Sequence, residues 1–258
     1  MRVTSSDGTA IAYERAGAGP ALVLVDPALG YRGFDNVRGL GERLTADFTV
    51  YSYERRGRGD SGDTPPYAVE REVEDLAAVI AETGGAACVY GFSSGALLAL
   101  QAAAAGVPIQ KLVLMEPPIG TDDDPADAAF TAEITELVTA GRRREAVERF
   151  LSDLPPEVLA GMEESMPALE AVAHTLVYDC LISDATTTRL LAKVPTPTLV
   201  LDSQGSGDDL TGWAASVAAA LPDARHRSLP GGWHGVPVEV LAPVVAEFCS
   251  GSDQRARS

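Results

Sequence analysis

One stretch of the sequence decides the fold of this chain: Ala87-Cys88-Val89-Tyr90-Gly91-Phe92-Ser93-Ser94-Gly95-Ala96-Leu97-Leu98-Ala99-Leu100. It begins as a short apolar run typical of a buried strand, turns through Gly-x-Ser-x-Gly and continues as an Ala/Leu-rich helix. A serine on so tight a turn has strained dihedrals, and the glycines let the strand and the helix approach closely. This is the pattern of a nucleophile elbow. We therefore predict that Ser93 presents its hydroxyl as a nucleophile.

On both sides of this stretch, short apolar runs alternate with amphipathic segments. The apolar runs predict two strands within residues 2–15 and further strands at 21–25, 48–53, 111–115, 198–201 and 224–229. Helical spacing of apolar residues predicts helices at 34–46, 69–82, 209–221 and 237–249. Strands that alternate with helices through short loops predict an α/β fold with a doubly wound, mostly parallel sheet.

Between residues 121 and 192 the alternation stops, and only helical periodicity remains. Candidate helices lie at 125–140, 142–153, 156–164 and 167–183. A segment rich in Pro and Asp at 117–125 marks the boundary. We predict a sheet domain formed by residues 1–118 and 193–250, a helical cap inserted at 119–192 and a disordered polar tail at 251–258.

The composition excludes several classes of function. The formal net charge of −17 argues against binding to nucleic acid or to an anionic membrane surface. No apolar run approaches the ~20 residues of a membrane span, and the first residues lack the apolar core of a signal peptide. The three cysteines fit neither a metal site nor a disulfide framework, which favours the cytoplasm. The composition is compatible with a homodimer.

Three motifs together resemble the α/β-hydrolase superfamily over essentially the whole chain. They are the elbow, the tight loop Arg55-Arg56-Gly57-Arg58-Gly59-Asp60-Ser61 and the late turn Gly232-Trp233-His234-Gly235. The order of Ser first and His last is that of the superfamily. The resemblance implies an α/β-hydrolase fold in which His234 is the general base for Ser93. It also implies that the arginine-rich loop hydrogen-bonds and fixes the backbone beside the elbow. For the other two histidines, His174 and His226, we expect structural roles.

The acid that completes the triad has two candidate places. Many relatives carry an Asp in the loop after the strand at 198–201, where this chain offers Asp202, Asp208 and Asp209. The last two also suit the start of the next helix. Other capped hydrolases, including haloalkane dehalogenases and zearalenone-type lactonases, place the acid after the strand that follows the elbow helix. Glu116 occupies that place, and we favour it over the three aspartates because two prolines stiffen its loop.

The oxyanion hole needs two backbone N–H groups. One comes from Ser94, at the N-terminus of the elbow helix. The other is expected from Ala28, in the loop after the strand at 21–25, with Leu29 as the fallback, because Pro27 has no N–H. The loop lacks the His-Gly pair of many relatives and weakly resembles that of the zearalenone-type lactonases.

These features imply a serine hydrolase that cleaves a carboxylic ester or lactone through an acyl-enzyme on Ser93, without a metal or organic cofactor. The expected substrate is small, neutral and largely apolar. Two alternatives are a cofactor-free cyclase or lyase on the same scaffold and a receptor-like ligand-binding protein. The cap residues among the expected lining also fit the interior of the cap. The expected lining residues are Leu29, Tyr31, Phe92, Met162, Met166, Leu169, Tyr178 and Trp233.

Overall fold

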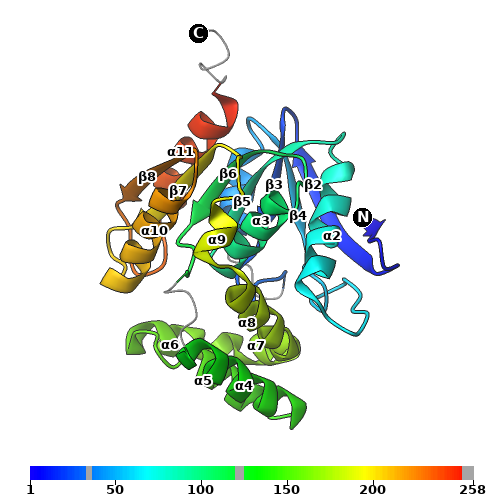
Figure 1. Cartoon of the computed structure of the whole chain (residues 1–258), viewed down its shortest axis with the longest axis vertical. Coiled ribbons are helices and arrows are strands. Elements are labelled where there is room, and N and C mark those ends of the chain that lie inside the picture. Colours follow the sequence, from blue (N-terminus) through cyan, green and yellow to red (C-terminus); the bar gives the residue numbers. More distant parts are fainter. Residues whose placement is uncertain (33–36, 120–124, 252–258) are drawn as a thin grey trace.

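The computed structural model describes residues 1–32, 37–119 and 125–251. Within these residues one eight-stranded sheet has the order β1-β2-β4-β3-β5-β6-β7-β8, and its β1–β2 and β2–β4 pairs are antiparallel while the others are parallel (Figure 1). The predicted α/β fold with a mostly parallel sheet is confirmed. The strands are β1 (Arg2–Thr4), β2 (Ala10–Gly17), β3 (Ala21–Val25), β4 (Thr49–Tyr53), β5 (Ala87–Phe92), β6 (Ile109–Met115), β7 (Thr198–Ser203) and β8 (Ala224–Leu229).

The central strands are apolar on both faces because helices cover both faces of the sheet. In β3, Leu22 and Leu24 face one hydrophobic core, while Val23 and Val25 face another. The first core receives α1 (Arg38–Leu44) and α11 (Val238–Ser250). The second receives helices on the opposite face, namely α2 (Val69–Ala81), α3 (Ser94–Ala104) and α10 (Asp208–Ala220). The predicted start of the first helix and all of the predicted tail but residue 251 lie outside the described residues.

The helices between β6 and β7 form a layer of their own. Figure 1 shows α4 to α7 gathered away from the sheet, with α8 running between this layer and the sheet. An apolar cluster that includes Ile134, Val147, Leu169 and Leu176 holds the layer together. Its helices are α4 (Pro125–Thr139), α5 (Arg143–Phe150), α6 (Pro156–Met162), α7 (Met166–Val172) and α8 (Leu176–Ala185), and the short α9 (Thr188–Leu191) leads back to β7.

The long helix predicted at 167–183 is wrong in one respect, because a 3-10 turn at Ala173–Thr175 divides it into α7 and α8. Thr175 sits at the break. Its hydroxyl donates to the carbonyl of Val172 at 2.8 Å and accepts from Arg58 Nε at 3.2 Å. A threonine hydroxyl that hydrogen-bonds a backbone carbonyl of the preceding turn gives that carbonyl an alternative to its regular helical partner. The short α9 was not predicted either. No helix in the described ranges is long and apolar enough to cross a bilayer.

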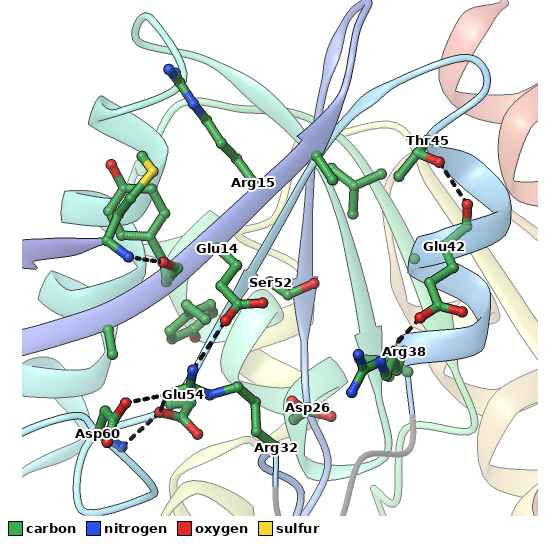
Figure 2. Close-up of a pocket in the computed structure, with 18 of the residues that line it drawn as sticks. Glu14, Arg15, Asp26, Arg32, Arg38, Glu42, Thr45, Ser52, Glu54 and Asp60 are labelled. Atoms are coloured by element: carbon green, nitrogen blue, oxygen red, sulfur yellow. Dashed lines mark hydrogen bonds and ion pairs between the residues drawn. The ribbon is translucent and has the colours of Figure 1, made fainter.

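A cavity of about 490 Å³ lies beside α1, against β2 and β4 (Figure 2). Most of the charged side chains that line it form ion pairs with one another. Arg32, for example, points at Glu54 and Asp60, with N–O distances of 2.8 and 2.5 Å. Neither Ser93 nor His234 lines this cavity. The predicted site lies outside this cavity, at the carboxyl ends of the strands.

Candidate active site

Ser93 lies at the turn between β5 and α3, with φ 52° and ψ −122°. The two glycines of the motif are sterically required. A Cβ on Gly91 would lie 2.6 Å from the carbonyl oxygen of Gly95, and a Cβ on Gly95 would lie 2.4 Å from that of Val25. Only glycine avoids such contacts. The turn is thus packed against itself and against the end of β3, as expected for a nucleophile elbow.

Backbone strain is concentrated at the predicted site. Among the described residues, the non-glycine residues with positive φ are Leu29 (62°), Ser93 (52°), Glu116 (45°) and His234 (50°). Each follows a different strand of the sheet: β3, β5, β6 and β8. A left-handed non-glycine residue costs about 1–3 kcal/mol and persists where the surrounding structure holds it, often at a functional site. The sequence motifs alone predict a place at the site for each of these four residues.

Glu116 and His234 form a hydrogen-bonded pair. Glu116 is fully buried, and its Oε2 lies 2.5 Å from His234 Nδ1. Its Oε1 accepts from the backbone N–H of Ser203 at 2.8 Å and from the hydroxyl of Ser206 at 2.6 Å. Burial raises the pKa of Glu116, but the hydrogen bonds outweigh this effect and the net pKa is lowered. The ionised carboxylate orients the imidazole so that Nε2 is its free nitrogen.

The lowered pKa of Glu116 makes the stability of the protein depend on pH. Ionised Glu116 favours the folded state above its ordinary pKa of 4.5, and this contribution is lost as the pH falls through the lower pKa of the folded protein. Glu116→Gln has no such group. We therefore expect the melting temperature of the wild type to fall more steeply below about pH 4.5 than that of the variant. Thermal unfolding followed by circular dichroism checks this, and parallel curves would contradict it.

The three alternative acids are held elsewhere. Asp202 is buried, but it pairs with His226 Nε2 and accepts from the Ser228 hydroxyl, both on β8. Asp208 and Asp209 are exposed in the first turn of α10. Of these four described carboxylates, Glu116 alone hydrogen-bonds His234.

Ser93 and His234 are brought to the same corner of the sheet. Phe92, which directly precedes Ser93, has its ring centroid 4.7 Å from that of the His234 imidazole. The Trp233 ring lies 5.2 Å from the same imidazole. The backbone N–H of Ser93 donates to the carbonyl of Met115, the residue before Glu116. The ends of β5 and β6 are thereby joined beside the histidine.

Ser206 is a residue of this corner that the sequence motifs did not reveal. Its hydroxyl donates to Glu116 Oε1 and accepts from the backbone N–H of His234 at 2.9 Å. It therefore connects the acid with the turn that carries the base. The sequence singles out this part of the chain for its aspartates, but the hydrogen bonds to Glu116 come from the backbone N–H of Ser203, at the end of β7, and from the Ser206 hydroxyl in the loop that follows.

Comparison with known proteins shows the family of the chain. Residues 22–247 match the model of the alpha/beta hydrolase family. The chain belongs to this family. It is similar to the crystal structure of an alpha/beta hydrolase from Sphaerobacter thermophilus, with 46% identity and a TM-score of 0.89 over 96% of this chain and 99% of that one.

This alpha/beta hydrolase also shares its fold with more distant structures. A thermophilic esterase from Thermogutta terrifontis has 21% identity and a TM-score of 0.74, over 96% of this chain and 95% of that one. An esterase from Exiguobacterium antarcticum has 18% identity and a TM-score of 0.75, over 96% and 97%. No protein with a curated function matched the chain.

Most of the predicted lining residues of this hydrolase share one apolar cluster. Leu29, Met166 and Leu169 are buried in it, and Ala28, Tyr31 and Met162 pack against it. The Tyr31 hydroxyl donates to the carbonyl of Ala168 in α7 at 3.0 Å, which ties the loop after β3 to the helical layer. The helical layer therefore meets the sheet at the loop predicted to complete the oxyanion hole.

Tyr178 is placed differently. Its ring stacks on Tyr67, with centroids 3.8 Å apart, and its hydroxyl donates to Asp63 Oδ2 at 2.8 Å. His174 Nε2 lies 3.8 Å from the same oxygen. Tyr178 thus joins α8 to the loop before α2, and these contacts serve the junction between the helical layer and the sheet.

The arginine-rich loop ties down backbone, as the family resemblance implied. Arg55, Arg56 and Arg58 are all buried. Arg56 binds the carboxylate of Asp75 through two nitrogens, at 2.7 and 2.8 Å. Arg58 Nη1 donates to the carbonyl of Pro27 at 2.6 Å and to that of Gly30 at 3.2 Å. In the described part of the chain, no group of three or more His, Cys, Asp or Glu side chains is arranged to hold a metal ion.

Proposed function

We propose that this alpha/beta hydrolase cleaves carboxylic esters, including lactones, through an acyl-enzyme on Ser93. The observation that carries the proposal is the hydrogen bond between buried Glu116 and His234, whose imidazole packs against Phe92, the residue directly before the strained Ser93 of the nucleophile elbow. The likeness in fold to the esterases from Thermogutta terrifontis and Exiguobacterium antarcticum supports the same reaction class.

In the proposed mechanism, His234 Nε2 removes the hydroxyl proton as Ser93 attacks the substrate carbonyl. The N–H groups of Ser94 and Ala28 stabilise the oxyanion of the tetrahedral intermediate, and losing one such donor typically costs about 3 kcal/mol. The imidazolium, held by ionised Glu116, then protonates the leaving alkoxide. Water attacks the acyl-enzyme with the help of the same histidine and releases the acid.

The proposed substrate is small to medium, neutral and largely apolar. Ala28, Tyr31 and Met162 are partly buried at the edge of the apolar cluster that contains Leu29, Met166 and Leu169, so a hydrocarbon part of the substrate would pack against them. The net charge of −17 disfavours an anionic substrate at long range.

Product analysis in water labelled with heavy oxygen tests this function. A panel of short-chain esters and lactones is incubated with the enzyme, and the products are analysed by mass spectrometry. We expect each cleaved substrate to gain one water and the label to enter the carboxylate. Products without added water would indicate a cyclase or lyase. Tight binding without turnover would indicate a ligand-binding protein. Either result would overturn the proposal.

The role of Ser206 gives a quantitative prediction. Ser206→Ala removes one of the hydrogen bonds that hold Glu116, so we expect kcat for ester hydrolysis to fall about tenfold with little change in KM. The matched control is Ser228→Ala, which loses a hydrogen bond to Asp202 and should keep kcat within about twofold. Equal kcat values for both variants in a p-nitrophenyl ester assay would show that Ser206 does not support the triad.

A further inference from the structure

One buried carboxylate in the helical layer reaches the elbow directly. Asp179 belongs to α8 and is 2% exposed. Its Oδ1 accepts from the Ser94 hydroxyl at 2.8 Å and from Arg55 Nη1 at 2.7 Å, while its Oδ2 accepts from Arg58 Nη2 at 2.8 Å. Ser94 is the first residue of α3 and carries one of the two proposed oxyanion donors.

The same carboxylate is linked to the other half of the oxyanion hole. Arg58, held by Asp179 through Nη2, uses Nη1 to donate to the carbonyls of Pro27 and Gly30. These two carbonyls flank Ala28 and Leu29, the loop proposed to supply the second N–H. Asp179 is thus linked to the backbone on each side of the oxyanion hole through a single side chain, that of Ser94 on one side and that of Arg58 on the other.

Asp179 is a carboxylate partner of both arginines in this network. Arg55 has a second carboxylate partner in Glu72, with N–O distances of 2.7 and 3.0 Å. Arg58 makes its other hydrogen bonds to two carbonyls and the Thr175 hydroxyl, so Asp179 supplies the carboxylate that it binds directly. Burial raises the pKa of Asp179, but Arg55 and Arg58 outweigh this and lower it, so the carboxylate is ionised.

We propose that Asp179 is a positioning residue through which the helical layer sets the geometry of the oxyanion hole. It fixes Ser94 by a direct hydrogen bond and fixes the loop of Ala28 through Arg58. The inference rests on the proposed esterase function. Oxyanion donors act only when they are aimed in advance at the place where negative charge develops, so a small displacement of either backbone lowers the rate.

Asp179→Asn tests the proposal, with Asp184→Asn as the matched control on the same helix. Asp184 is exposed and hydrogen-bonds Thr131. Active sites are counted with a fluorophosphonate so that rates refer to folded enzyme. We expect kcat per active site to fall about 30- to 100-fold in Asp179→Asn, with KM nearly unchanged, and to stay within about twofold in the control.

A pair of inhibitors separates positioning from a merely structural role. A trifluoromethyl ketone forms a tetrahedral adduct whose oxyanion occupies the hole, whereas the matching methyl ketone binds mainly as a ground-state ligand. We expect Asp179→Asn to weaken binding of the trifluoromethyl ketone by about the same factor as kcat and to leave the methyl ketone unaffected. Equal effects on both ketones, or none, would overturn the proposal.

Ser94→Ala covers the case in which Asp179→Asn does not fold, because it leaves every buried charge in place. It removes only the hydroxyl between Asp179 and the elbow, and we expect a loss of about five- to tenfold in kcat with the same discrimination between the two ketones. Wild-type kcat and ketone affinities in Ser94→Ala would refute the positioning role. Failure of the wild type to hydrolyse any ester would instead refute the proposed function.

Discussion

Replacing Ser93 with alanine is expected to abolish turnover and leave ligand binding intact. Only the nucleophilic oxygen is lost, because alanine fits the space of serine at the elbow. Removing the nucleophile of a Ser-His-acid triad lowers kcat by about 10⁴- to 10⁶-fold, with a residual rate from the remaining binding groups. Steady-state kinetics on the best ester of the panel measure the loss. Calorimetry with a non-hydrolysable ether analogue measures the binding.

The control for this result is Ser228→Ala, the same substitution on β8, where the hydroxyl binds Asp202. We expect it to retain nearly all of the activity. Turnover by Ser93→Ala above a hundredth of the wild-type rate would rule out covalent catalysis by Ser93. Loss of binding together with turnover would mean that the elbow itself had been disturbed.

Glu116→Gln is expected to have the second largest effect, a fall in kcat of about 10³- to 10⁴-fold. The amide keeps the shape of the side chain but loses the charge that stabilises the imidazolium. It also presents an N–H donor to His234 and can favour the wrong tautomer. The effect should fall mainly on kcat, since Glu116 is buried beneath the histidine and does not face the substrate.

The aspartates of the loop after β7 provide matched controls for Glu116. Asp208 and Asp209 are exposed residues in the first turn of α10. We expect the kcat of Asp208→Asn and of Asp209→Asn to stay within about twofold of the wild-type value. Kinetics of the three variants on one ester rank the carboxylates. A larger loss in either aspartate variant than in Glu116→Gln would move the acid of the triad to that loop.

The parts of the site that the sequence predicts are those fixed by local backbone chemistry. The elbow is recognisable because its strand, its serine and its glycines are contiguous. Glu116 is recognisable because it stands at a strand end before two prolines. Ser93 and Glu116 directly follow β5 and β6, which are neighbouring parallel strands, so the two residues must lie at the same edge of the sheet.

The parts that the sequence does not predict depend on contacts between distant segments. Ser206 binds a carboxylate 90 residues away, and Asp179 binds a hydroxyl 85 residues away. Asp179 also lies in a segment that is predicted to be helical from the spacing of its apolar residues. In such a pattern a single acidic residue is assigned to the solvent-exposed face of the helix. Its partners become evident only when α8 is packed against the arginine-rich loop.

Intact-mass analysis after treatment with a fluorophosphonate tests the activated serine most directly. The reagent is applied in parallel to the wild type, to Ser93→Ala and to Ser228→Ala. We expect one adduct on the wild type and on Ser228→Ala, and none on Ser93→Ala, because only a serine activated by a neighbouring base reacts. An unmodified wild type, or an adduct that persists in Ser93→Ala, would contradict the assignment of Ser93 as the nucleophile.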